Sequence, residues 1–144
     1  MAKVLVAYAT RTGQTKKIAE AIADGLKTEG VEVTLENINK LKDVHDFEGY
    51  DGYVFGAATY HGEMMGPMKT MLFLVEKANL KGKVGGAFGA FGWSGEAPGR
   101  IFDTMKNIFE MDMVGGPLKI KKVTAGDGAQ KARAYAQEIA AKLG

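Results

Sequence analysis

The most informative absences in this sequence are side chains that bind metals or perform covalent chemistry. The chain of 144 residues contains no cysteine, which excludes disulfide bridges, thiolate nucleophiles and iron–sulfur ligation. Its only histidines, His45 and His61, do not stand with carboxylates at the spacing of metal ligands. We therefore expect no metal site, and no residue is assigned a catalytic role.

Long apolar runs and a strong charge of one sign are also missing. No run approaches the roughly 18 residues of a membrane span, and the N-terminus lacks a signal-peptide layout, so a cytoplasmic protein without membrane contact is expected. The net charge of +2 is spread along the chain, which argues against nucleic acid as a partner. The length and the hydrophobic share of 46% predict a single soluble domain, residues 1–144.

Strand-like and helix-like segments alternate along the whole chain, a pattern typical of an α/β fold with a parallel sheet. Continuous apolar runs at 4–9, 53–58 and 84–91 suit central strands buried on both faces. Alternating patterns at 31–36 and 118–121 suit edge strands. Right-handed crossovers then give a five-stranded parallel sheet of order 2-1-3-4-5 with helices on both faces, a three-layer architecture.

Three helices have clear apolar faces. Pro67 and Pro98 fit the first turns of two of them, and Asp127 fits the N-cap of the last. The side chains expected to face the core are Met68, Met71, Leu72 and Val75 in the first helix, Ile101, Phe102, Met105 and Ile108 in the second, and Ala132, Tyr135, Ala136, Ile139, Ala140 and Leu143 in the last.

The loop Thr10–Thr15 joins the first strand to a helical pattern and holds three threonines and a glycine. Its hydroxyl and N–H donors lie at a helix N-terminus, where the helix dipole favours an anion, so the loop predicts a phosphate site. It lacks the motifs of nucleoside triphosphatases and of dinucleotide-binding folds. The alternative is that the threonines only cap the helix, and Arg11 either touches the phosphate or faces solvent.

Two further loops follow central strands at the same sheet edge. Residues 59–65 contain Tyr60, and residues 91–96 contain the only tryptophan, Trp93. Aromatic side chains in both loops suggest walls for a flat ring, whereas ordinary packing over the end of the sheet is the alternative for Trp93.

These motifs resemble those of a known family. Thr10-Arg11-Thr12-Gly13-Gln14-Thr15 resembles the Thr-x-Thr-Gly-x-Thr phosphate loop of flavodoxins. The stretch Gly89–Ala97 is similar to the flavin loop in the flavodoxin-like domain of flavodiiron proteins, and Ala58–Gly62 is similar to that family's Pro-Thr-x-Asn-Gly segment. The resemblance covers essentially the whole chain and implies a short-chain flavodoxin-like fold that binds FMN.

The resemblance also assigns roles by position. The FMN phosphate would be bound by Thr10, Arg11 (through its backbone), Thr12, Gly13, Gln14 and Thr15. One side of the flavin ring would be lined by Thr59, Tyr60, His61 and Gly62, and the other side by Ala90, Phe91, Gly92, Trp93, Ser94 and Gly95. Ala58 and His61 depart from the family's proline and asparagine.

The function implied is that of a one-electron carrier that uses the semiquinone and hydroquinone forms of FMN and passes electrons between redox partner proteins as a monomer. An FMN-dependent NAD(P)H:quinone oxidoreductase on the same fold is the alternative. Flavodoxins are acidic proteins, whereas this chain is slightly basic. Lys119, Lys121 and Lys122 either steer an acidic partner or form a solvated strand edge.

Overall fold

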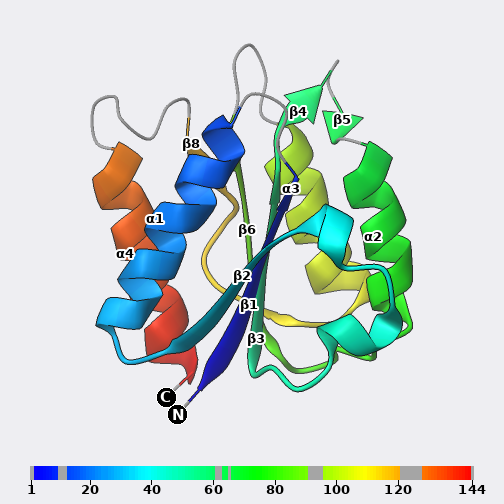
Figure 1. Ribbon diagram of the computed structural model, residues 1–144, viewed down its shortest axis with the longest axis horizontal. Helices are drawn as coiled ribbons and strands as arrows, with labels where there is room; N and C mark the ends of the chain where they lie inside the picture. Colours follow the sequence, from blue (N-terminus) through cyan, green and yellow to red (C-terminus); the bar gives the residue numbers. More distant parts are fainter. Residues whose placement is uncertain are drawn as a thin grey trace.

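The computed structural model describes residues 2–9, 13–60, 63–64, 66–90, 96–120 and 128–143. Strands and helices alternate along these ranges, as the sequence predicts (Figure 1). The main elements are β1 (Lys3–Ala9), α1 (Gln14–Thr28), β2 (Glu32–Asn37), β3 (Gly52–Ala57), α2 (Gly66–Glu76), β6 (Val84–Ala90), α3 (Glu96–Asp103), β7 (Asp112–Met113), β8 (Leu118–Ile120) and α4 (Gly128–Leu143).

The main sheet is parallel and has the predicted central order. β1 lies between β2 and β3, with Val6 opposite Leu35 on one side and Val54 on the other. β6 follows β3, and β7 follows β6 at the edge. Every residue of β3 and β6 is buried, because helices cover both faces of these strands. The predicted 2-1-3-4-5 order is thus confirmed.

The fifth position of the sheet departs from the prediction of one continuous strand. β7 pairs with Val84 and Gly85 at the start of β6, whereas β8 pairs with the last three residues of β6. Sequence reasoning found only the stretch that contains β8. The two-residue β7 is too short to show an alternating pattern, and Gly115, at φ 50°, lies between the two strands.

A tyrosine from α4 fills the gap that this division leaves beside β6. The Tyr135 hydroxyl accepts a hydrogen bond from the Ala87 N–H at 2.8 Å and donates one to the Ala87 carbonyl at 3.2 Å. A Cβ atom on Gly86 would lie 2.8 Å from the same hydroxyl, so the strand needs glycine at this position. Burial raises the pKa of Tyr135 well above its usual range, against the smaller opposing effect of its bond to Ala87.

The helices form two layers, with α1 and α4 on one face of the sheet and α2 and α3 on the other (Figure 1). Alternate residues of β1 point to opposite faces of the sheet. Val4 and Val6 pack in the core under α1 and α4, and Leu5 and Ala7 pack in the core under α2 and α3. Gly25 lets α1 approach α4, since a Cβ there would lie 2.7 Å from the Ala136 Cβ.

The predicted helix faces are confirmed with one exception. Met68, Met71, Leu72 and Val75 are buried, but Ile108 is 60% exposed. After α3 the chain forms a π-helical turn, Thr104–Ile108, which has more residues per turn than an α-helix and so changes which residues face the sheet. Phe109 takes the buried position in place of Ile108. Asp127, the predicted N-cap of α4, lies outside the described residues.

A small antiparallel pair forms where the sequence suggested only a loop. β4 (Thr59–Tyr60) pairs with β5 (Glu63–Met64), with Thr59 opposite Met64 and Tyr60 opposite Glu63. Two-residue strands carry too little pattern to be found by alternation, which requires four or more residues.

Replacing Tyr135 with phenylalanine tests the side-chain bridge to β6. The change leaves two buried backbone groups of Ala87 without their partner, so we expect the free energy of unfolding to fall by about 1–3 kcal/mol in urea denaturation. Tyr50→Phe is the matched control, because this half-buried tyrosine shows no hydroxyl hydrogen bond within the described residues. Equal losses in the two variants would contradict the bridge.

Tyr135→Phe should also change how the free energy of unfolding depends on alkaline pH. Because the pKa of Tyr135 is raised in the folded state, the unfolded chain loses this proton first as the pH rises. The stability contributed by the neutral hydroxyl is therefore complete below pH ~10 and declines above it. We expect Tyr135→Phe to show a shallower loss of stability than the unsubstituted protein above that pH.

Candidate functional site at the carboxyl edge of the sheet

The predicted site loops leave the sheet at one edge. β1 ends at Ala9, β3 at Ala57 and β6 at Ala90, and these carboxyl ends face the same way because the strands are parallel. α1 begins at this edge (Figure 1). In an open parallel sheet, ligands bind outside the carboxyl ends of the strands, next to the point where strand order reverses. Here that point lies between β1 and β3.

The structure places some of the predicted site residues at this edge. Gly13, Gln14 and Thr15 start α1, Ala90 ends β6, and the backbone of Thr59 and Tyr60 forms β4. The other predicted site residues lie outside the described ranges: Thr10, Arg11, Thr12, His61, Gly62, Phe91, Gly92, Trp93, Ser94 and Gly95.

A glycine forms the entry to α1. Gly13 is the N-cap residue and has φ 90°, in the left-handed region that glycine adopts without steric cost. Its carbonyl accepts a hydrogen bond from the Lys17 N–H at 3.2 Å, and no side chain of the described residues caps the helix. The backbone donors of the first turn therefore point out of the helix toward the sheet edge, where a negatively charged group is favoured.

Two buried polar atoms beside this helix start have no hydrogen-bond partner in the part of the chain that the structure describes. Thr15 is 1% exposed, and its hydroxyl Oγ1 makes no hydrogen bond within the described chain. The same is true of Oε1 in the neighbouring Gln14 side chain. An unsatisfied buried polar group costs about 1–3 kcal/mol, so folded proteins retain such groups chiefly where a water, ion or ligand completes them.

For Thr15, this geometry favours the ligand interpretation over simple helix capping, while Thr10 and Thr12 lie outside the described residues. A capping threonine would use its hydroxyl on a backbone N–H, but Thr15 Oγ1 is not so engaged. Thr15 Oγ1 can donate a hydrogen bond to an anionic group, whereas Gln14 Oε1 is an acceptor, so a ligand that carries both an anionic group and an O–H or N–H donor would satisfy the two atoms. The donor set at the start of α1 thus fits a phosphate group.

Sequence reasoning missed Gly89, the glycine that brings two of the site loops together. A Cβ at this position would lie 2.2 Å from the Ala57 carbonyl oxygen and 2.7 Å from Pro98 Cγ. The ends of β3 and β6 and the first turn of α3 can therefore meet only around a glycine. The repeated glycines of β6, at 85, 86 and 89, are the signal that marks this close approach.

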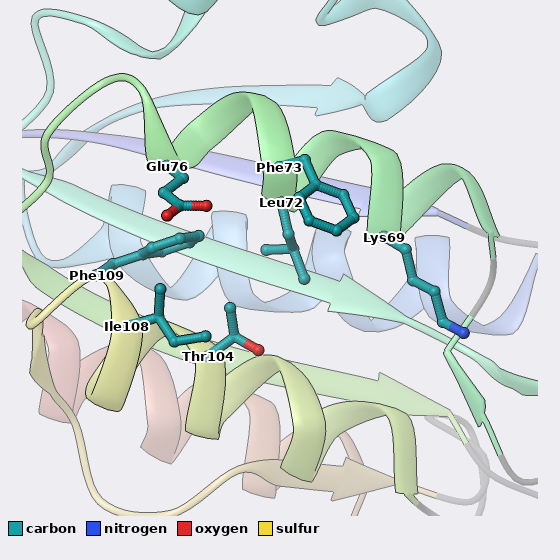
Figure 2. Close-up of a pocket in the computed structure, with 7 residues that line it drawn as sticks. All are labelled: Lys69, Leu72, Phe73, Glu76, Thr104, Ile108 and Phe109. Atoms are coloured by element: carbon teal, nitrogen blue, oxygen red, sulfur yellow. The ribbon is translucent and has the colours of Figure 1, made fainter.

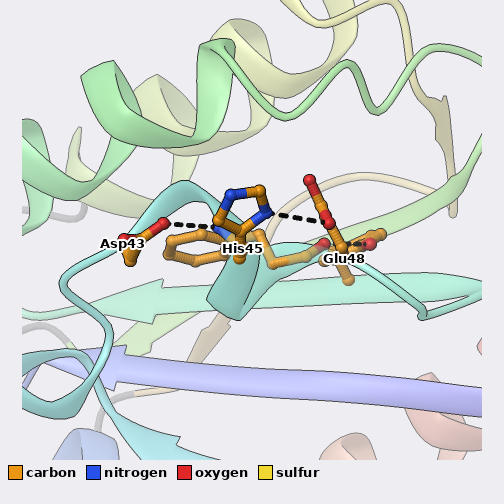
Figure 3. A network of polar contacts seen from close by, with 5 residues as sticks. Asp43, His45 and Glu48 are labelled. Atoms are coloured by element: carbon orange, nitrogen blue, oxygen red, sulfur yellow. Dashed lines mark hydrogen bonds and ion pairs between the residues drawn. The ribbon is translucent and has the colours of Figure 1, made fainter.

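His45, the histidine within the described residues, lies away from the candidate site. His45 lies in a short 3-10 helix, Val44–Phe47, just before β3 and so at the opposite edge of the sheet. Its Nδ1 lies 3.1 Å from Glu48 Oε2, and its backbone N–H donates to Asp43 at 2.9 Å (Figure 3). The hydrogen bond to Glu48 raises the pKa of this exposed imidazole. This network holds the turn that buries Phe47 and has no part in the site.

Within the described ranges, no group of three or more histidine or carboxylate side chains is placed to hold a metal ion. Among the helices that the structure describes, none is both long enough and apolar enough to span a membrane.

The fold defines a doubly wound α/β domain in which the start of α1, with its buried Thr15 hydroxyl, lies at the switch point of the sheet. Comparison with known proteins narrows this class. A model of the flavodoxin domain matches residues 5–127, and the chain belongs to the flavodoxin family.

Relatives and solved structures agree with this assignment. The chain is 35% identical over 129 residues to putative diflavin flavoprotein A 6 of Nostoc sp., covering 84% of this chain and 22% of that protein. A flavodoxin from the domain Archaea superposes with a TM-score of 0.91 at 30% identity, with 98% of both chains covered. Rubredoxin oxygen:oxidoreductase from Desulfovibrio gigas superposes with a TM-score of 0.88 at 26% identity, and the match covers 98% of this chain and 36% of that one.

Membership in the family confirms FMN, the cofactor that the resemblance of the sequence motifs implies. The chain spans between 22% and 33% of the length of the first four curated relatives, so it matches one domain of those larger proteins.

Replacing Thr15 with valine tests whether its hydroxyl belongs to the ligand site. Valine keeps the shape but removes an unpartnered polar group, so the apoprotein should unfold with equal or higher free energy. The Kd for FMN should rise about tenfold or more, because a hydrogen bond to a charged group is lost. Fluorescence titration of FMN and urea denaturation measure the two effects.

Thr28→Val is the matched control on the same helix. The Thr28 hydroxyl donates to the Asp24 carbonyl at 2.9 Å in the last turn of α1, far from the helix start. Its loss should leave the Kd for FMN unchanged. If Thr15→Val instead destabilises the apoprotein without changing FMN binding, the Thr15 hydroxyl has a structural role.

Proposed function

We propose that this chain is an electron-transfer domain that carries single electrons between redox partner proteins on non-covalently bound FMN. The observation that carries this proposal is the buried Thr15 hydroxyl at the start of α1, which has no hydrogen-bond partner within the described residues and can donate to an anion. It lies at the sheet position where the family binds its cofactor. When bound, FMN supplies the redox chemistry, and the protein supplies binding, orientation and the surrounding charge.

In this proposal the start of α1 anchors one end of the cofactor. Gly13 allows the backbone to approach the phosphate, Thr15 donates its hydroxyl to it, and Gln14 Oε1 accepts a hydrogen bond from a hydroxyl group of the same cofactor. The preceding residues Thr10, Arg11 and Thr12 complete the loop. No catalytic side chain is assigned to these positions, since their task is to hold an anion.

The two remaining loops enclose the ring in this proposal. Residues 59–62 extend from β3 through β4 and flank one side, and residues 90–95 continue from β6 and flank the other. The close contact of Gly89 with the Ala57 carbonyl supports this arrangement, because it sets the starting points of both loops next to each other. Aromatic side chains in these loops favour stacking on a flat ring.

The distribution of charge suggests which surface of a partner protein would approach. Lys16 and Lys17 in the first turn of α1, and Lys119 in β8, are exposed near the carboxyl edge of the sheet. Carboxylates gather before β3 at the opposite edge, where Asp43, Asp46, Glu48 and Asp51 are all exposed. Three exposed lysines near the cofactor site favour an acidic docking surface on the partner.

The spectrum and turnover of the purified protein test the proposed function. We expect visible flavin absorption from the holoprotein and fast oxidation of the reduced holoprotein by a one-electron acceptor such as ferricyanide. NADH and NADPH should not be oxidised steadily by the holoprotein alone. Steady oxidation would replace this proposal with an NAD(P)H:quinone oxidoreductase, and a colourless protein that does not bind added FMN would contradict both.

The charge of the cofactor edge makes electron transfer selective among acceptors. With an acidic acceptor protein, the second-order rate constant should fall as salt is added, whereas with a basic acceptor it should rise. Lys16→Glu and Lys119→Glu should each slow transfer to the acidic acceptor several-fold at low salt, in stopped-flow measurements. Lys27→Glu, in the last turn of α1, is the control. A salt response that these substitutions leave unchanged would remove the steering role.

A further inference from the structure

Two glycines bring the backbones of β3 and β6 into close contact at the point where these strands part. The backbone ladder between the strands ends at Gly56 and Phe88, although β6 continues for two more residues beside β8. Gly56 in β3 receives the side chain of Phe88, and Gly89 in β6 receives the backbone of Ala57. We call these two reciprocal contacts, together with Pro98, the strand-end contact.

On the sheet face covered by α1 and α4, the ring of Phe88 occupies the space beside Gly56. A Cβ at Gly56 would lie 2.2 Å from Phe88 Cε2 and 2.3 Å from Phe88 Cζ. Phe88 is fully buried in this core, so its ring cannot move aside without disturbing close-packed neighbours. A side chain of β6 thus fills the gap that a glycine of β3 provides.

On the opposite face the two strands exchange these roles. A Cβ at Gly89 would lie 2.2 Å from the Ala57 carbonyl oxygen and 2.7 Å from Cγ of Pro98, in the first turn of α3. Ala57 and Pro98 are both buried. The backbone of β3 and a rigid proline ring thus fill the gap that a glycine of β6 provides.

The rest of α3 keeps Pro98 in place. Ile101 and Met105 are fully buried against the sheet. Phe109, which follows the π-helical turn, belongs to the same core as Leu72 of α2, and both line the groove between these segments (Figure 2). α3 is therefore held along its length, and its first turn has a defined position against Gly89.

The strand-end contact lies directly before the two loops proposed to flank the flavin ring. Ala57 precedes residues 58–62, and Gly89 precedes residues 90–95. Because each strand places a group into the other, neither strand end can shift without a steric clash or the loss of buried contacts. The positions from which the two ring loops start are therefore fixed relative to each other.

We propose that the strand-end contact positions the flavin ring by fixing the separation of the two ring loops. Gly56 and Gly89 are positioning residues, since they act through the loops and not by touching the ring. This inference rests on the proposed placement of the ring between residues 58–62 and 90–95. The phosphate end of the cofactor is held separately, at the start of α1.

The separation of the loops affects oxidised and reduced FMN differently. Two-electron reduction takes up two electrons and one proton at N5 and leaves a negative charge near N1. A ring held closely between two loops is shielded from water, which disfavours this charge. A wider separation admits water and stabilises reduced FMN relative to oxidised FMN. The strand-end contact therefore lowers the reduction potential of the bound cofactor.

Adding one methyl group at either glycine tests the proposal. In Gly89→Ala and in Gly56→Ala, the Kd for oxidised FMN should rise about tenfold, and the Kd for riboflavin by the same factor, because both ligands carry the ring. Reduced FMN should lose less affinity, so the two-electron midpoint potential should rise by up to about 30 mV, the equivalent of a tenfold change in the ratio of the two Kd values. Fluorescence titration and anaerobic dithionite reduction with a redox dye measure these effects.

Phe88→Val supplies a rescue, because valine lacks the ring atoms that a methyl group at Gly56 would meet. In the Phe88→Val background, Gly56→Ala should change the Kd for FMN by less than about twofold. Pro98→Ala tests the other contact by removing atoms. It should shift the potential in the same direction as Gly89→Ala, and it keeps the proposal testable if Gly89→Ala does not fold.

Gly85→Ala is the matched control at the other end of β6. A Cβ there would lie 2.7 Å from Met113 Sδ, on the same strand face as Gly89. This variant should lower the free energy of unfolding and leave the potential unchanged. Thr15→Val, at the phosphate end, should instead reduce the difference in Kd between FMN and riboflavin, which the strand-end variants preserve.

Two results would overturn the proposal while FMN binding and electron transfer remain intact. One is an equal shift of potential in Gly85→Ala and Gly89→Ala. The other is an unchanged potential in Gly56→Ala and Pro98→Ala, with both variants folded by circular dichroism. The proposed function fails by a different result, since an unsubstituted protein that does not bind FMN would contradict it before any variant is made.

Discussion

The burial of β1, β3 and β6 on both faces is the constraint on which the rest of the molecule depends. A parallel strand covered by helices on both sides must be joined to its neighbour by a crossover, and each crossover returns the chain to the same edge. That edge therefore collects the ends of all three central strands and the start of α1. Gln14 and Thr15 come to lie where ligands bind in such sheets because the hydrophobic core requires this connectivity.

Close backbone contacts convert this arrangement into a specific site. β6 uses glycines where other atoms occupy the space of a side chain: the sulfur of Met113 at Gly85, the Tyr135 hydroxyl at Gly86 and the Ala57 carbonyl at Gly89. At these positions β6 has no side chain to pack against its neighbours. The neighbouring elements can therefore approach its backbone closely, and the loops after β3 and β6 begin side by side.

The sequence predicted the features that repeat over many residues. Continuous apolar runs identified the central strands to within one residue, and the threonine-rich loop pointed to an anion at the start of α1. Short or irregular elements could not be found in this way. β4, β5 and β7 have two residues each, and the π-helical turn that exposes Ile108 breaks the helical period. Hydrogen-bonding partners are equally hidden, because Tyr135 and Ala87 are 48 residues apart.

The hydroxyl of Tyr135 has a consequence for the behaviour of the protein in a crowded solution. A strand with free N–H and C=O groups at a sheet edge is a template on which another chain can add a strand and begin to aggregate. The break between β7 and β8 would leave such a place beside the middle of β6. A single side chain from α4 occupies both hydrogen-bonding positions of Ala87, so the sheet tolerates a divided outer strand without offering a growth point for fibrils.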